Sequence, residues 1–341
     1  MTLGPSSLNN NLVDIPRRVI VGRPTNKKTG EKSRFVDYDE GHACTVESLC
    51  LQNYNQTEHG AWDGIHCEGS PLRALFFLLL WDDVIFLPGI SGTFLTPFQS
   101  GPLDLDCARH FSSNREAQLA AALGRISRES QHGLAKRVRE SWFQNRGKIC
   151  RGVNWYTDPR LLVVCAASVG GPVLAEIFGA LASDFHHFSG GLPDLFLWRW
   201  KDQDETRDGD GSVDGPEIDP TLFASSRIRG QQQDGQPNTS GEVMHLDSVY
   251  HADLDAIEAA LLCKPGTLQS KIVEVKGPRD TLMARQVAWL QILVKATAVN
   301  KNLCSVEVCH VEEKSWASAK KSKKKTTKKK KKNKRKMESV E

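Results

Sequence analysis

Two short apolar segments, far apart in the chain, each carry side chains that could take part in hydrolysis of a phosphodiester. The first segment carries Asp194, and the second carries Glu274 and Lys276. In a β-strand, side chains two positions apart point to the same face, so Glu274 and Lys276 lie together. Asp194, at the start of a neighbouring strand, can converge on the same point. Two carboxylates suit a hard cation such as Mg²⁺, which takes oxygen ligands and keeps several waters.

A cation at this point would stabilise charge on the phosphate and lower the pKa of an attacking water. Lys276 would orient that water or neutralise the charge on the phosphate. The alternative is that both segments are ordinary solvated strand ends, because Pro-Asp and Glu-x-Lys also occur by chance. The surroundings favour the functional interpretation. A Gly-Gly turn precedes the first strand, a Lys-Gly-Pro turn follows the second, and an amphipathic helix is expected over residues 280–296.

Longer stretches around these residues resemble a known family. They are Gly-Gly-Leu-Pro-Asp-Leu at 190–195, Val-Glu-Val-Lys-Gly-Pro-x-Asp-x-Leu at 273–282, Gln-Val-Ala-Trp-Leu at 286–290 and Val-Glu-Val-Cys-His-Val at 306–311. These stretches are similar to the VRR-NUC domain of the PD-(D/E)xK nuclease superfamily. More closely, residues 17–313 resemble the C-terminal portion of the Fanconi-anaemia-associated nuclease family.

The resemblance implies both a fold and an activity. The fold is an α/β, restriction-endonuclease-like PD-(D/E)xK core, a mixed sheet flanked by helices, packed with an upstream helical region. The activity is that of a metal-dependent, structure-selective DNA hydrolase, a 5′ flap endonuclease and 5′–3′ exonuclease in interstrand cross-link repair. The implied cofactor is Mg²⁺ or Mn²⁺, and the implied partners are branched or flapped DNA and repair-complex proteins.

The resemblance also extends the metal site. The family has a metal-binding Glu in a Gly-Ile-His-x-Glu-Gly motif, and Glu68 stands at that position. Without the resemblance, Glu68 would be interpreted as a helix-start acid favoured by the helix dipole. The implied ligands are therefore Glu68, Asp194, Glu274 and the backbone carbonyl of Val275, with Lys276 assisting the nucleophile.

Three further residues are implied to hold DNA phosphate or to order the site. Arg285 stands where the family has a basic phosphate-contacting residue, and a guanidinium suits bidentate phosphate binding. Gln286 matches a Gln beside the metal, where it holds a ligand or water. His186 stands where the family commonly has an Arg that seats the terminal phosphate of the flap, and its ordinary pKa of about 6.5 leaves it only partly charged. The alternative for Arg285 and Gln286 is an exposed helix residue without a role in catalysis.

Charge and hydropathy suggest where the chain works. The 341 residues carry a net charge of +4, but residues 314–341 alone carry +12 and the rest −8. We expect this Lys-rich tail to be disordered. Its role would be that of a nuclear localisation signal, of a segment that binds phosphate in a salt-sensitive way, or of a merely solubilising tail. No signal peptide begins the chain, and the longest apolar run, Ala74–Trp81, is far shorter than the ~18 residues of a membrane span. A soluble nuclear protein without a membrane partner is expected.

The composition divides the chain into four parts. A β-hairpin of Arg18–Gly22 and Arg34–Asp37 is expected in the first part, a helix over 172–188 in the third, and a short helix at 251–262. The parts are 1–60, hairpin and helix; 61–169, a helical region that contributes Glu68; 170–313, the nuclease core with a disordered acidic insertion at about 200–250; and 314–341, the tail.

Other chemical interpretations are weaker. The nine cysteines contain no Cys-x-x-Cys pair, so free buried thiols are favoured over disulfides or zinc. An Asp-Gly run in the insertion lacks the closing Glu of a calcium loop. Trp142 and Trp155 are interpreted as core rather than as base-stacking platforms. The remaining rivals are another restriction-like enzyme such as a junction resolvase, a catalytically silent DNA-binding scaffold, and a chromatin or RNA-associated protein that binds through its tail.

Overall fold

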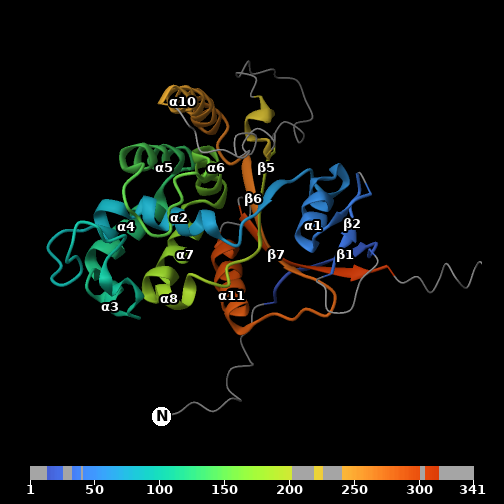
Figure 1. Cartoon of the computed structure of the whole chain (residues 1–341), viewed down its shortest axis with the longest axis horizontal. Coiled ribbons are helices and arrows are strands. Elements are labelled where there is room, and N and C mark those ends of the chain that lie inside the picture. The colour runs from blue at the N-terminus through green and yellow to red at the C-terminus, as the bar shows by residue number, and fades with distance from the viewer. Residues whose placement is uncertain are drawn as a thin grey trace, which may run out of the picture.

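A five-stranded mixed sheet runs through the middle of the molecule, with helices on both faces (Figure 1). The computed structural model describes residues 14–25, 33–39, 41–201, 219–225, 240–299 and 304–314. The strand order is β1 (Arg17–Gly22), β7 (Cys304–Glu313), β6 (Leu268–Lys276), β5 (Leu195–Trp200), β4 (Asp63–His66). β1, β7 and β6 run parallel, whereas β5 is antiparallel to both β6 and β4. The predicted mixed sheet flanked by helices is confirmed.

The larger hydrophobic core lies between one face of the sheet and most of the helices. Strand residues Trp198, Ile272 and Val306 point into it and are almost fully buried. The helices of this side are α2 (Ser70–Leu79), α3 (His110–Ser113), α4 (Glu116–Arg128), α5 (Gln131–Asn145), α6 (Pro159–Val169), α7 (Gly171–Ser183), α8 (Phe185–Phe188), α10 (Ser240–Cys263) and α11 (Ala284–Val299). Trp142 is 2% exposed and is a core residue, as predicted, whereas Trp155 is half-buried and packs against the core with its ring 5.0 Å from that of Trp142.

The opposite face of the sheet is covered by one helix, α1 (Val46–Asn55), and a small sheet of β2 (Phe35–Val36) and β3 (Ala43–Cys44). Figure 1 shows α1 and β2 on the far side of the sheet from α2 and α5. Because side chains alternate along a strand, Val273 and Val275 of β6 pack toward α1 while Ile272 packs toward the larger core. Glu274 therefore points to the same side as Ile272.

The predicted N-terminal hairpin is largely wrong. β1 pairs in parallel with β7 over six residues, and the next segment meets β2 only through an isolated bridge between Pro24 and Phe35. Pairing with β7 runs along the whole length of β1 and places Ile20 in the small core against α1. A turn-rich sequence between two short apolar runs does not distinguish these two pairings.

Two predicted helices have different bounds. The helix expected over 172–188 is broken at Asp184 into α7 and α8, because the Asp184 carboxylate accepts a hydrogen bond from the His187 N–H and starts a second helix. The helix expected from Asp280 begins at Ala284, since the Asp280 carboxylate accepts from the Gly277 N–H and closes a turn instead.

Parts of the insertion and the tail lie outside the described residues. Within the described part, α10 includes the helix predicted at 251–262, and a short 3₁₀ turn at Pro220–Phe223 stacks Phe223 on Trp200 with ring centres 4.7 Å apart. The remaining irregular turns are Thr57–His59 and Leu103–Asp106, both 3₁₀, and a π-helical turn at Trp81–Ile85. Among the described residues, no single helix is long and apolar enough to cross a membrane, and only α6 with α7, bent by 105°, meets that test as a pair.

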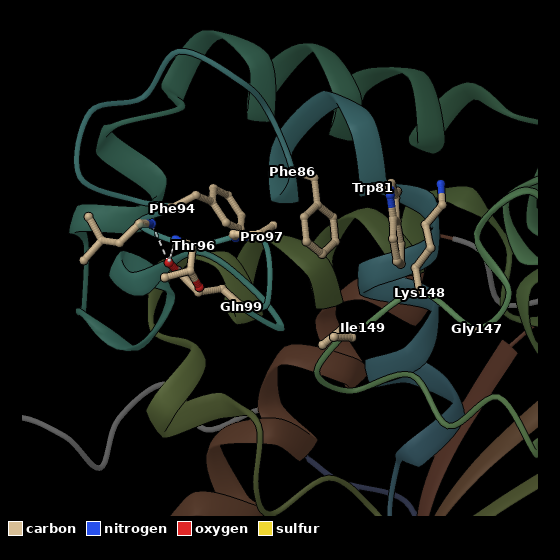
Figure 2. A pocket seen from close by; sticks show the side chains of 10 residues that line it. Trp81, Phe86, Phe94, Thr96, Pro97, Gln99, Gly147, Lys148 and Ile149 are labelled. Atoms are coloured by element: carbon tan, nitrogen blue, oxygen red, sulfur yellow. Dashed lines mark hydrogen bonds between the residues drawn. The ribbon is translucent and has the colours of Figure 1, made fainter.

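An open pocket of about 770 Å³, with aromatic side chains in part of its wall, lies at the C-terminal end of α2 (Figure 2). Its walls are Trp81, Phe86, Phe94, Leu95, Thr96, Pro97, Gln99, Gly147, Lys148 and Ile149. No carboxylate is among these lining residues. Glu68 lies beyond the opposite end of α2, and a ten-residue helix is about 15 Å long. The pocket is therefore separate from the predicted metal site.

Candidate active site

The register of β5 and β6 brings the two separated acidic segments together. Leu195 pairs with Val273. Asp194, one residue before Leu195, and Glu274, one residue after Val273, therefore lie next to each other at the same end of the two antiparallel strands. The Asp194 carboxylate accepts a hydrogen bond of 2.7 Å from the N–H of Val275. Val275 is thus fixed between the two carboxylates, although its carbonyl remains only a predicted ligand.

The glycines before Asp194 allow this approach. Gly191 has a φ of 75°, in the left-handed region that side chains disfavour. A Cβ at Gly191 would lie 2.7 Å from Cγ of Arg285, and one at Gly190 would lie 2.8 Å from the Arg285 Nη1. The Gly-Gly turn therefore lets Arg285, an exposed residue of the first turn of α11, lie directly over the segment that leads to Asp194.

Glu274, Lys276 and Gln286 form a closed hydrogen-bonded triangle between β6 and α11. Oε1 of Glu274 accepts from Nζ of Lys276 at 2.7 Å and from Nε2 of Gln286 at 2.6 Å. Oε1 of Gln286 accepts from Lys276 at 3.1 Å and from the N–H of Met283 at 3.0 Å. Glu274 is fully buried and Lys276 is 7% exposed. The strand period of two thus places both side chains on the same face, and Gln286 fixes them.

Two properties of Glu274 suit a cation. Its second carboxylate oxygen, Oε2, is buried and has no hydrogen-bond partner among the residues that the structure describes. Burial first, and then the neighbouring Asp194 carboxyl, raise the pKa of Glu274 to about 7, although the Lys276 ammonium acts in the opposite direction. Burial also raises the pKa of Asp194. A buried oxygen without a partner, beside a second carboxylate, fits an oxygen-seeking divalent cation, which would favour the ionised form of both groups.

Glu68 is joined to the pair of Asp194 and Glu274 by main-chain hydrogen bonds to Asp194. Its N–H donates to the carbonyl of Asp194 at 3.2 Å, and the N–H of Cys67 donates to the same oxygen at 2.9 Å. The Glu68 side chain is 75% exposed, and its carboxylate is 3.8 Å from Nε2 of His66. In the part of the chain that the structure describes, no three His, Cys, Asp or Glu side chains are grouped closely enough to hold a metal. The structure therefore brings the Glu68 backbone, and not its carboxylate, to the pair.

His186 lies on α8, exposed to solvent and four residues before Gly190. The segment between α8 and β5 is tied to α11 by Trp289, whose indole N–H donates to the carbonyls of Phe188 and Gly190, both at 3.1 Å. Arg285 and His186 thus belong to two segments that the same tryptophan holds together.

Arg73 was missed by the sequence analysis. It lies on α2, and its Nη1 donates to the carbonyl of Glu68 at 2.9 Å and to the carbonyl of Ser189 at 3.1 Å. One signal in the sequence could have found it. Arg73 is the single charged residue of a ten-residue helix, and all the remaining residues from Pro71 to Leu79 are buried.

The cysteines of the described region are free thiols. The thiols of Cys50 and Cys309 lie 3.6 Å apart in the core between α1 and β7. Burial raises the pKa of Cys304 to about 12, which keeps it protonated.

Comparison with known proteins supports this interpretation of the fold. The family model of the VRR-NUC domain matches residues 129–207, a range that includes Asp194 and ends before Glu274. A Fanconi-associated nuclease 1 homolog of Oryza sativa is 33% identical over 312 residues, 90% of this chain and 24% of that protein. Fanconi-associated nuclease 1 of Homo sapiens is 30% identical over 307 residues, 87% of this chain and 23% of that protein. The chain thus spans about a quarter of the length of these relatives.

A solved structure has the same fold. A crystal structure of paFAN1 bound to 2nt 5′flap DNA with gap superimposes with a TM-score of 0.54 and 20% identity, covering 91% of this chain and 40% of that one. The mixed sheet, its flanking helices and the paired acidic segments define the class of the molecule, a VRR-NUC domain with a restriction-endonuclease-like core. Within that class the chain is similar, over about nine tenths of its length, to proteins of the Fanconi-associated nuclease family.

Proposed function

We propose that this chain hydrolyses phosphodiester bonds of branched DNA as a divalent-metal-dependent, structure-selective nuclease. The observation that carries the proposal is the buried Glu274, which has one oxygen without a partner, lies beside Asp194 and is bonded to Lys276. A solvated strand end would have none of these features. The similarity to Fanconi-associated nucleases supports the same activity.

Each residue of the site has a distinct role in this proposal. Asp194, Glu274, Glu68 and the Val275 carbonyl hold Mg²⁺ or Mn²⁺, which when bound supplies positive charge for the phosphate and acidifies a water. Lys276 orients the attacking water and neutralises charge that develops on the phosphate. Gln286 keeps the Glu274 carboxylate and the Lys276 ammonium in place, since it bonds to both.

The proposed substrate is a duplex with a 5′ flap or end, cut as a flap endonuclease and 5′–3′ exonuclease during interstrand cross-link repair. The names of the relatives and the flap DNA in the paFAN1 crystal structure support this substrate. Arg285 and His186 would hold a phosphate of the DNA beside the turn at Gly190. The Lys-rich tail would direct the chain to the nucleus, where repair-complex proteins would be its partners.

The test is cleavage of a labelled, 5′-phosphorylated flap duplex by the wild type and by Asp194→Ala, with Mg²⁺, Mn²⁺ or EDTA, and with DNA binding recorded alongside. We expect the wild type to cut only with metal, and Asp194→Ala to bind DNA within about threefold of wild type while its cleavage rate falls at least about a thousandfold.

Other outcomes decide between the rivals. If the wild type cuts a four-way junction in preference to the flap, the chain is a junction resolvase. If neither protein cuts any branched substrate while both bind, the chain is a DNA-binding scaffold. If removal of residues 314–341 abolishes binding, the tail carries the affinity for DNA and the folded part does not.

A further inference from the structure

Arg73 ties together the two backbone segments from which Glu68 and Asp194 project. One nitrogen, Nη1, donates to the carbonyl of Glu68 at 2.9 Å and to the carbonyl of Ser189 at 3.1 Å. Ser189 opens the turn that leads to Asp194, so a single side chain bonds to both segments. The two segments are more than a hundred residues apart in sequence, and β4 and β5 bring them side by side.

The Glu68 turn needs support of this kind. Glu68 has a φ of 47° and the following Gly69 a φ of 70°, so two successive residues adopt left-handed backbone. That conformation is unfavourable for a residue with a side chain and persists only where surrounding contacts hold it. On one side the N–H of Glu68 donates to the carbonyl of Asp194, and on the other its carbonyl accepts from Arg73.

We propose that Arg73 is a positioning residue that holds the Glu68 turn where its carboxylate can share a divalent cation with Asp194 and Glu274. The inference rests on the proposed function only in that Glu68 acts as a ligand of that cation. Arg73 touches neither the cation nor the substrate in this role. It acts on metal affinity by fixing the backbone from which one carboxylate projects.

The sign of the effect separates this role from simple electrostatics. A guanidinium remains charged at neutral pH, and a positive charge close to a cation site weakens the binding of that cation. Replacing Arg73 by an uncharged residue should therefore tighten metal binding if charge alone matters. A positioning role predicts weaker binding, because the Glu68 turn loses one of its two main-chain anchors.

The experiment is calorimetric titration of the metal-free full chain with Mn²⁺, without DNA, for the wild type and Arg73→Met. We expect the Mn²⁺ dissociation constant of Arg73→Met to rise at least about tenfold, the size of effect that residues supporting a metal ligand usually have. Arg125→Met is the matched control, since Arg125 is a half-exposed arginine of α4 paired with Asp83. Its Mn²⁺ affinity should equal that of the wild type.

Arg73→Lys provides a second arm. It restores the positive charge while its shorter ammonium does not reach both carbonyls in the same geometry, so it should also bind Mn²⁺ more weakly than the wild type. Thermal unfolding of each variant verifies that the fold is retained. Because the bonded carbonyls are near the surface, water can replace Arg73 there, and we expect the melting temperature to fall by no more than a few degrees.

The outcomes separate the two proposals. Wild-type or tighter Mn²⁺ affinity in Arg73→Met overturns the positioning role, whether or not the wild type cuts DNA. Weakened Mn²⁺ binding in both Arg73 variants, together with a wild type that cuts no branched DNA, supports the positioning role and rejects the proposed nuclease function. Absence of Mn²⁺ binding by the wild type overturns both.

Discussion

The candidate site has two halves that are held in different ways. In one half, Glu274 and Lys276 of β6 are buried and are bonded to Gln286 of α11. In the other half, Glu68 lies on an exposed turn, and only its main chain is bonded to the rest of the site. The first half is fixed by side-chain contacts inside the core, and the second by hydrogen bonds to backbone groups.

Each half contains a feature that costs free energy when no cation is bound, and the feature differs between the two halves. The buried half places a carboxylate with an unpartnered oxygen in the core, and the pKa of Glu274 rises to about 7 as a result. The exposed half holds a residue with a side chain at a φ of 47°. A divalent cation would give the buried oxygen of Glu274 a partner and favour the ionised form of that residue. In the exposed half, binding of the cation by the Glu68 carboxylate would offset the unfavourable backbone conformation of Glu68. The three predictions that follow test this division.

The largest effect is expected from Lys276→Met in the buried half. Because Lys276 contacts the reacting atoms in the proposed mechanism, its loss should lower single-turnover cleavage of a 5′-phosphorylated flap at least about a thousandfold, while DNA affinity changes less than about threefold. The matched control is Lys271→Met. Lys271 lies on the same strand, on the α1 side of the sheet, and pairs with Glu307 at 3.1 Å. Equal losses in both variants would mean that Lys276 acts through stability and not through chemistry.

A second, smaller effect concerns pH. In the metal-free protein the folded-state pKa of Glu274 is about 7, against an ordinary value of 4.5. The folded state thus binds a proton more tightly than the unfolded state. Stability from this group is complete below pH 4.5 and is lost as the pH rises through 7, by about 3 kcal/mol at the upper limit.

Glu274→Gln keeps the shape and cannot ionise, so it should remove this loss. Urea unfolding in EDTA at pH 5 and pH 8 should show the wild type losing at least about 1 kcal/mol more than Glu274→Gln between the two pH values. Saturating Mn²⁺ at pH 8 should restore the wild type, because a ligand of the folded state stabilises it. Identical pH dependence of the two proteins would show that the buried half carries no such strain.

Much of the buried half could be predicted from the sequence. The strand period of two places Glu274 and Lys276 on one face, and the Gly-Gly turn before Asp194 signals a close backbone approach. The amphipathic pattern also located α7 and α11 to within a few residues. These features are local, since each depends on residues that are neighbours in the chain.

The exposed half and its supports could not be predicted in the same way. Nothing near Arg73 in the sequence specifies that its side chain meets the carbonyl of Ser189, more than a hundred residues later. The pairing of β1 with β7 depends equally on residues at opposite ends of the chain. The break at Asp184 depends on a local hydrogen bond between its carboxylate and the His187 N–H. An aspartate inside an apolar helical pattern can either cap a new helix or point to solvent from a continuous one, and the sequence alone does not distinguish the two.

The smallest expected effect concerns the exposed half, and it is the stability of variants of Glu68. Glu68→Gly removes the side chain from a position whose φ is positive, where only glycine is unstrained. We therefore expect metal-free Glu68→Gly to be more stable to urea than Glu68→Ala by about 1 kcal/mol, because alanine keeps the strain. Both variants lose the carboxylate, so both should bind Mn²⁺ equally weakly. If glycine is not the more stable of the two, the Glu68 turn stores no strain, and the exposed half is not unfavourable without a cation. If glycine is more stable and metal binding falls in both, then the same residue opposes folding and favours metal binding, which is the property that distinguishes this half of the site from the buried one.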